Sequence, residues 1–288
     1  MICLSALGTE KNQGELDMSD NYLKFFEDVK SGFKDNLQIK SLYDKPFSDV
    51  YNSYEADNEE IALYLDEAVN CGQDILELCC GNGRITVPLS RNNFNVTGVD
   101  CSEDMLALLE EKKNSLPFNV RKRIKILNQD VFSTNLEEKF DMVILPATTI
   151  CILFDDAQKT MQLFKNVANM LKDHGKFLFD IRDYDNVEKK SAPMSVAFED
   201  KICLSYEHID KRIGQATGMF LALTKAPNGL MKMHMAESYK KIISQETIEE
   251  FISHSPFLIE KKERYSFDND DLFLYVLRKE EDNNGEYR

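Results

Sequence analysis

The sequence has no apolar run approaching the ~20 residues that a membrane-spanning helix needs. Its opening residues, MICLSALG, lack the length and the basic start of a secretory signal peptide. These two absences argue against a membrane span and a leader, and we expect a cytoplasmic protein without membrane partners. Charged residues make up 30% of the chain, which predicts a well-hydrated surface.

Cysteine pairs with metal-binding or redox spacing are also missing. The seven cysteines are an odd number, lie scattered along the chain and include no C-x-x-C pair. This distribution argues against a disulfide framework and against a zinc site. We therefore expect reduced thiols and no bound metal ion.

A concentrated basic stripe is the third feature that the sequence lacks. Asp and Glu number 50 against 35 Lys and Arg, which gives a formal net charge of -15. A negative field repels phosphate backbones, so nucleic acid is not an expected partner. With 288 residues and 43% hydrophobic composition, the chain can bury the core of one large domain or of a domain with a modest appendage.

The stretch from Asp74 to Ser90 has the pattern of a strand, a glycine turn and a helix. The apolar run 75–78 is short enough for a buried parallel strand. Gly81 and Gly83 then supply backbone without a Cβ atom where the chain must turn sharply. The helix that follows would direct free N–H groups at the turn, which predicts a ligand site there. Upstream, the acidic run from Glu55 to Glu60 is typical of a solvated helix start.

Strands and helices alternate after this turn. The predicted elements are, in order, a strand at 95–100, a helix at 102–115 capped by Ser102, strands at 124–128 and 142–145, a helix at 157–171 and a strand at 176–181. This alternation predicts an α/β fold, with a doubly wound parallel sheet that helices cover on both faces.

The alternation stops between residues 195 and 239. Short segments in which every second residue is apolar, with a turn at 226–229, predict an inserted antiparallel sheet after the fifth strand. We expect the chain to have four parts. They are an N-terminal tail and helix (1–38), a core domain (39–194 and 240–280), the inserted sheet (195–239) and a disordered polar tail (281–288).

Residues near the glycine turn favour one class of ligand over another. Dinucleotide-binding turns follow the pattern G-x-G-x-x-G, but Thr86 stands where the third glycine should be. Glu77, Asp100 and Asp130 fall at or just beyond predicted strand ends that meet at one edge of the sheet. Their negative charge disfavours a pyrophosphate. The sequence therefore argues against a nicotinamide-dependent reductase and favours a cationic ligand.

From about Tyr43 to Lys279 the chain resembles the class I S-adenosylmethionine-dependent methyltransferases. The resemblance rests on the stretch DILELCCGNGRITVPLS, on the acidic end of the second strand and on FDMVILPATTI as the fourth strand. It implies a Rossmann-like methyltransferase sheet with S-adenosyl-L-methionine as cofactor. The implied contacts are to the methionyl part from Glu77, Cys79 (a glycine in the family), Gly81, Gly83 and Leu145, to the ribose from Asp100, and to the adenine from Cys101, Met105, Asp130 and Val131.

The acceptor side resembles a narrower branch, the dTDP-aminosugar N,N-dimethyltransferases, whose relatives also methylate peptide amines and other small molecules. The resemblance rests on YNSYEADNEE before the core, on ATTI and on the insertion before HMAESYKKIISQETIEEFI. It implies that Tyr51 lies over the cofactor, and that the inserted sheet serves the acceptor and the subunit contacts of a homo-oligomer. Topology alone suggests as substrate-binding residues Thr148, Thr149, Asp180 and Arg182.

The sequence marks no residue as an obligatory base. Candidate catalytic residues in the predicted insertion are His208, His234 and Tyr239, although an amine acceptor in a dry site can also lose its proton to water. We expect a methyltransferase acting on an amine of a small molecule or peptide, and an O-methyltransferase or a non-catalytic cofactor-binding protein stays open. Residues 145–148 do not form the D/N-P-P-Y/F motif of DNA amino-methyltransferases.

Overall fold

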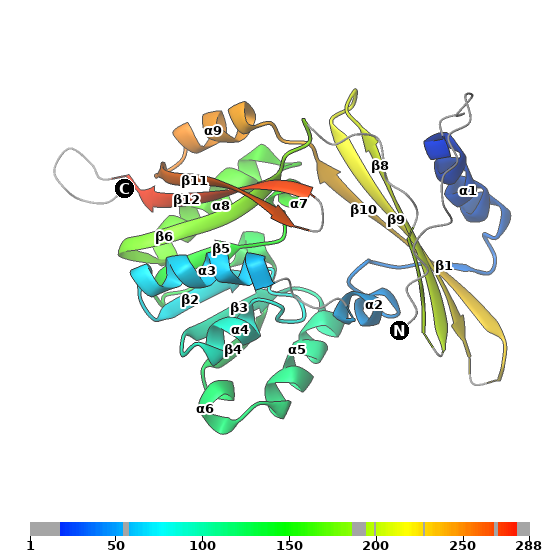
Figure 1. Ribbon diagram of the computed structural model, residues 1–288, viewed down its shortest axis with the longest axis horizontal. Coiled ribbons are helices and arrows are strands. Elements are labelled where there is room, and N and C mark those ends of the chain that lie inside the picture. The colour runs from blue at the N-terminus through cyan, green and yellow to red at the C-terminus, as the bar shows by residue number, and fades with distance from the viewer. Residues whose placement is uncertain are drawn as a thin grey trace. The chain divides into compact units, whose positions relative to one another are not determined.

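The computed structural model describes residues 18–53, 58–185, 194–198, 200–226, 228–267 and 270–280. The chain divides into two compact units, a smaller one of residues 1–53 and 188–240 and a larger one of residues 54–187 and 241–288 (Figure 1). The polar tail predicted at 281–288 lies outside the described residues. Residues 39–53 group with the predicted insertion, whereas the sequence places them in the core domain.

The larger unit is built on a seven-stranded sheet with the order β11-β12-β6-β5-β2-β3-β4. Its strands are β2 (Asp74–Leu78), β3 (Asn95–Asp100), β4 (Ile124–Asn128), β5 (Phe140–Leu145), β6 (Leu171–Arg182), β11 (Phe257–Phe267) and β12 (Asp270–Lys279). Strands β4, β3, β2, β5 and β6 run parallel to one another, and β12 is antiparallel to both β6 and β11. The predicted parallel, doubly wound sheet is therefore confirmed.

Helices connect these strands in the predicted alternation (Figure 1). They are α3 (Asn58–Cys71), α4 (Thr86–Arg91), α5 (Glu103–Ser115), α6 (Phe118–Arg121), the 3-10 turn η1 (Val131–Ser133), α7 (Ile150–Leu153), α8 (Ala157–Met170) and α9 (Gln245–Ser253). Ser102 caps α5 as predicted, because its side chain accepts a hydrogen bond from Met105 N. Asp156 caps α8 in the same way and so fixes where that helix begins.

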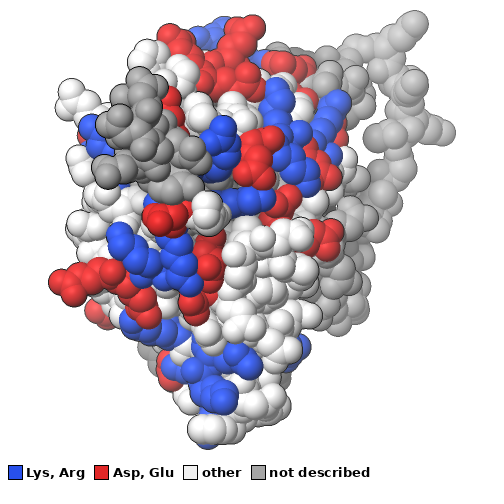
Figure 2. All heavy atoms as spheres, turned by 90° about the vertical axis from the view of Figure 1, so that its left-hand side faces the viewer, with Lys and Arg blue, Asp and Glu red and all other residues white. Residues whose placement is uncertain are grey.

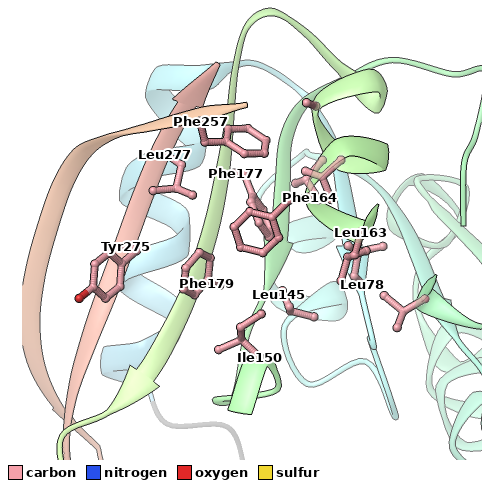
Figure 3. Packing of buried hydrophobic residues seen from close by; sticks show 14 of the residues in the cluster. Leu78, Leu145, Ile150, Leu163, Phe164, Phe177, Phe179, Phe257, Tyr275 and Leu277 are labelled. Carbon is pink, nitrogen blue, oxygen red and sulfur yellow. The ribbon is translucent and has the colours of Figure 1, made fainter. Parts of the chain in front are cut away.

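Alternating strand residues form two apolar layers, one on each face of this sheet. On one face, Phe164 of α8 lies 5.2 Å from Phe177 and 5.8 Å from Phe179, measured between ring centroids (Figure 3). On the other face, Tyr64 of α3 belongs to a cluster with Ile75 and other strand residues. Helices thus cover both faces, so the sheet leaves only its edges and strand ends for a site.

The smaller unit has a five-stranded sheet with the order β1-β10-β9-β8-β7. Its elements are α1 (Met18–Gly32), β1 (Leu37–Ile39), α2 (Phe47–Asn52), β7 (Met194–Ala197), β8 (Lys201–Asp210), β9 (Gln215–Lys225) and β10 (Met231–Lys241). Strands β7, β8 and β9 pair antiparallel, and β1 pairs parallel with β10. The inserted strands therefore share their sheet with a strand from the N-terminal region, which the sequence did not predict.

Helix α1 packs on one face of this smaller sheet. Phe26 and Val29 are buried against Tyr206, Met219 and Met235, and Lys30 pairs with a carboxylate of β10. Met233 and Met235 of β10 therefore contribute to this core, whereas Met231 is exposed.

Charges of both signs are mixed on the surface. On the face shown in Figure 2, Lys and Arg side chains are interspersed with Asp and Glu side chains. Among the described residues, no helix has the length and apolar content needed to cross a membrane.

Candidate functional site

The strand order of the larger unit predicts the place of a ligand crevice. From β2 the chain crosses to β3 on one side, whereas β5 and β6 lie on the other side of β2. The loops that leave the carboxyl ends of β2 and β5 therefore diverge, and ligands of doubly wound sheets bind where this happens. The glycine turn after β2 and the loop 146–149 after β5 border this position.

Two glycines of the turn have conformations that other residues resist. Gly81 and Gly83 have φ values of +52° and +76°. A Cβ atom on Gly83 would lie 2.2 Å from Cδ1 of Leu109, so no larger residue fits there unless this buried side chain shifts. Cys79, which replaces a glycine of the resembled family, also has a positive φ, of +56°. The structure therefore tolerates about 1–2 kcal/mol of backbone strain at Cys79.

Glu77 is a buried carboxyl group below the turn. Its side chain is 1% exposed, and the hydroxyl of Thr86 donates a hydrogen bond to its Oε2. Burial raises the pKa of Glu77 from 4.5 to about 8, although the Thr86 hydrogen bond and the charge of Arg84 oppose the rise. Burial therefore favours the protonated form of this carboxyl group in the ligand-free protein. Thr86 therefore serves as the hydrogen-bond donor to Glu77. In the sequence it was noticed only because it stands where a dinucleotide-binding turn has its third glycine.

Asp100 ties the glycine turn to the end of β3. Its Oδ2 accepts a hydrogen bond of 2.8 Å from Gly81 N, and its Oδ1 accepts one of 2.8 Å from Ser102 N. Burial raises the pKa of Asp100, while these N–H groups favour the charged form. The N–H group of Cys101 does the same. A carboxylate has about four acceptor sites, so Asp100 can still accept a hydrogen bond from a ligand hydroxyl.

The predicted adenine side consists of residues beyond β3 and β4. Met105 is 2% exposed and lies under the turn, since its methyl group would be 3.0 Å from a Cβ on Gly81. Cys101 is exposed beside Asp100. Asp130 caps η1 by accepting a 2.7 Å hydrogen bond from Phe132 N, while Val131 is buried.

A buried ion pair supports the turn from the side of α3. The two terminal nitrogens of the Arg84 guanidinium group donate to the carboxylate of Glu60. Nη1 donates to Oε2, and Nη2 donates to Oε1 at 2.9 Å. Glu60 is 2% exposed, so the prediction that the acidic run is solvated is wrong for this residue. Its pairing with a cation in the turn explains how the charge is accommodated.

The loop after β5 has an uncommon backbone. Ala147 and Thr148 have φ values of +63° and +54°, in the left-handed region that β-branched residues avoid. Thr148 N donates a 3.0 Å hydrogen bond to Oδ1 of Asp180, and the hydroxyl of Tyr265 donates a 2.8 Å bond to Oδ2. Asp180 is 0% exposed and bonded to the backbone of this loop, and its role toward an acceptor stays a prediction.

Other predicted contact residues have partners within the protein. The hydroxyl of Thr149 donates to Pro146 O at 2.6 Å, and Arg182 pairs with Asp270 of β12 at 2.6 Å. Leu145 is fully buried in the core cluster, so its side chain packs the sheet. The roles of Thr149 and Arg182 toward an acceptor stay predictions.

The predicted catalytic residues and Tyr51 belong to the smaller unit, whereas the other predicted cofactor contacts belong to the larger unit. His208 lies on β8, where it is paired with Thr217 of β9. His234 is 7% exposed, its Nε2 lies 3.0 Å from Thr224 Oγ1, and burial lowers its pKa.

Tyr239 is half exposed and donates a 2.7 Å hydrogen bond to Glu237, and this bond raises its pKa to about 12. At neutral pH this phenol is almost entirely protonated, so very little phenolate is present to accept a proton from a substrate. The catalytic roles of Tyr239 and the two histidines, and the role of Tyr51 over a cofactor, stay predictions.

Part of the chain is similar in sequence to known proteins. Residues 75–175 match a family model described as a methyltransferase domain. YqeM of Bacillus subtilis, named as a methyltransferase, is 34% identical over 108 residues, which are 37% of this chain and 41% of that protein. The chain thus spans about two fifths of the length of this curated relative.

Solved structures share the fold over most of the chain. The sugar N-methyltransferase KedS8 from Streptoalloteichus has a TM-score of 0.61 at 18% identity, covering 97% of this chain and 99% of its own. The glycopeptide N-methyltransferase MtfA, solved with S-adenosyl-L-methionine, has a TM-score of 0.59 at 16% identity, covering 88% and 96%. A third of the chain therefore matches the methyltransferase domain family, and the chain has the fold of the S-adenosylmethionine-dependent methyltransferases, in agreement with the resemblance found in its sequence.

Proposed function

We propose that the protein transfers a methyl group from S-adenosyl-L-methionine to an amine nitrogen of a small-molecule or peptide acceptor. The observation that carries this proposal is the glycine turn with Glu77 below it and Asp100 bonded to it, at the point where the strand order reverses. The match of residues 75–175 to the methyltransferase domain family supports the same conclusion.

The residues around the turn suit this cofactor better than a dinucleotide. Glu77 is able to balance the positive charge of the methionyl part by giving up its proton, whereas it would repel a pyrophosphate. Asp100 ends β3, where a carboxylate binds ribose hydroxyls. Met105, Asp130 and Val131 would contact the adenine. The cofactor supplies a methyl group already activated on a sulfonium, so the chain's own residues need mainly to bind and align it.

An amine acceptor agrees with the protonation states of the candidate bases. Tyr239 keeps its proton at neutral pH, and His234 is neutral but buried. An amine must lose one proton before it attacks, and water can accept that proton, whereas an alcohol needs a base. The fold neighbours KedS8 and MtfA are N-methyltransferases, which supports nitrogen over oxygen as the acceptor atom.

The first experiment is calorimetric titration of the full chain with S-adenosyl-L-methionine, with NADH and NADPH as controls. We expect micromolar binding of the first ligand alone. Binding of a nicotinamide cofactor, or of none of the three, would contradict the proposal.

The second experiment measures S-adenosylhomocysteine release with a panel of aminosugars, amines and peptides, and with matched alcohols. Product with amines supports N-methylation, and product with alcohols alone would indicate an O-methyltransferase. Cofactor binding without turnover on the whole panel would favour a non-catalytic binding protein. The net charge of -15 supports such acceptors over nucleic acid. A homo-oligomer formed through the five-stranded sheet stays a prediction, which light scattering tests.

A further inference from the structure

Two successive left-handed residues mark the loop after β5 as conformationally strained. Each such residue costs about 1–2 kcal/mol, and neither Ala147 nor Thr148 is a glycine. Strain of this kind persists only where the surrounding structure enforces it. The loop's own hydrogen bonds, Thr149 N to Pro146 O and Cys151 N to Thr148 O, begin a helical turn but leave Thr148 N for another acceptor.

That acceptor is Asp180, which lies inside β6 one strand away. The carboxylate is fully buried. One of its oxygens accepts a hydrogen bond from Thr148 N of the loop, and the other accepts one from the hydroxyl of Tyr265 in β11. Desolvation and the nearby charge of Asp180 strongly raise the pKa of Tyr265, so its hydroxyl is a hydrogen-bond donor over the whole working pH range. The chain Tyr265–Asp180–Thr148 therefore links a strand at the sheet's edge to the loop that borders the crevice.

We propose that Asp180, supported by Tyr265, is a positioning residue that holds the strained loop 146–149 in the shape required for cofactor binding. The inference rests on the proposed function, because it assigns the loop to the wall of that cofactor site. Without the carboxylate, Thr148 returns to an ordinary backbone conformation and the wall of the crevice changes shape. Asp180 acts through the backbone of Thr148 and does not itself touch the ligand.

The same cluster offers a matched control in Tyr64. This tyrosine of α3 is 1% exposed, and its hydroxyl has no hydrogen-bond partner among the residues that the structure describes. Burial raises the pKa of Tyr64, and Asp180 and Tyr265 raise it further, which indicates that the three groups lie near one another. Tyr64→Phe and Tyr265→Phe are therefore the same chemical change in one cluster, but only the second removes a bond to Asp180.

The test is calorimetric binding of S-adenosylhomocysteine to the full chain, with thermal unfolding measured in parallel. We expect Asp180→Ala to weaken binding about tenfold, which corresponds to one hydrogen bond to a charged group. Tyr265→Phe weakens it less, and Tyr64→Phe leaves it unchanged. Asp180→Asn retains an oxygen that can accept the hydrogen bond from Thr148 N. Its affinity for S-adenosylhomocysteine should therefore be closer to that of the parent chain than the affinity of Asp180→Ala.

A second change separates positioning from general stabilisation. Glycine adopts a positive φ without strain, so Thr148→Gly should restore most of the affinity that Asp180→Ala loses, to within about threefold. The inference is overturned if Asp180→Ala and Tyr265→Phe both bind S-adenosylhomocysteine as tightly as the parent chain does. It is also overturned if Asp180→Ala loses affinity that Thr148→Gly does not restore. If the parent chain itself fails to bind S-adenosylhomocysteine, the proposed function fails and the inference fails with it.

Discussion

The protonation state of Glu77 gives a prediction that ligand-free protein can test. Burial raises the pKa of this carboxyl group to about 8 in the folded chain, against an ordinary value of 4.5. The folded state thus binds the proton more tightly than the unfolded state does. Its contribution to stability is fully present below pH 4.5 and is lost as the pH rises through 8.

The size of this effect follows from the shift. One pKa unit corresponds to about 1.4 kcal/mol, so the full shift is on the order of 5 kcal/mol between acidic and alkaline conditions. Glu77→Gln has nearly the same shape and cannot ionise. We therefore expect the stability of this variant to lack the pH dependence that the Glu77 carboxyl group causes. At pH 8 its free energy of unfolding should exceed that of the parent chain by several kcal/mol, on the order of the full shift.

The assay is urea unfolding of the ligand-free chain and the Glu77→Gln variant from pH 4.5 to 8.5. The difference between the two unfolding free energies should rise with pH, by at most about 1.4 kcal/mol per unit. Thr86→Val is the matched control, because it removes the hydrogen bond that favours the ionised form and should move the titration to higher pH. Parallel pH profiles for the parent chain and Glu77→Gln would refute the reasoning.

Three further predictions concern the turn. Asp100→Ala should weaken S-adenosylmethionine binding by about 1.5–3 kcal/mol in calorimetry, through lost hydrogen bonds to a carboxylate, and unchanged affinity would contradict the ribose assignment. Arg84→Met leaves the buried Glu60 without its cation, so denaturant unfolding should register a loss of about 3–5 kcal/mol, which adding Glu60→Gln reduces. Gly83→Ala should lower the unfolding temperature more than Gly214→Ala, because both have positive φ but only Gly83 faces a close side chain; equal losses would exclude the steric cause.

Local patterns were sufficient to predict the architecture of the larger unit. The strand at 95–100 and the helix capped by Ser102 were predictable because periodicity and capping act between residues close in sequence. Gly81 and Gly83 were recognisable for the same reason, since a sharp turn between a strand and a helix needs a positive φ.

Errors arose where a distant segment decides the environment of a residue. Glu60 looks like a solvated helix start in the sequence, but the turn 24 residues later brings Arg84 to it and the pair is buried. Strand β1 is too short to show a strand pattern, and pairing with β10 is what makes it part of a sheet. In both cases tertiary contacts override the local preference.

Local sequence patterns were enough to predict the order of strands and helices in the larger unit, the glycine turn and the adjoining acidic residues Glu77 and Asp100, because each depends on neighbouring residues. The tertiary structure alone decided that Asp180 holds the backbone of Thr148, 32 residues away, and accepts a hydrogen bond from Tyr265, 85 residues away. The physical reason is that strand order and register set which buried groups meet, and a carboxylate inside a sheet must find its hydrogen-bond donors there.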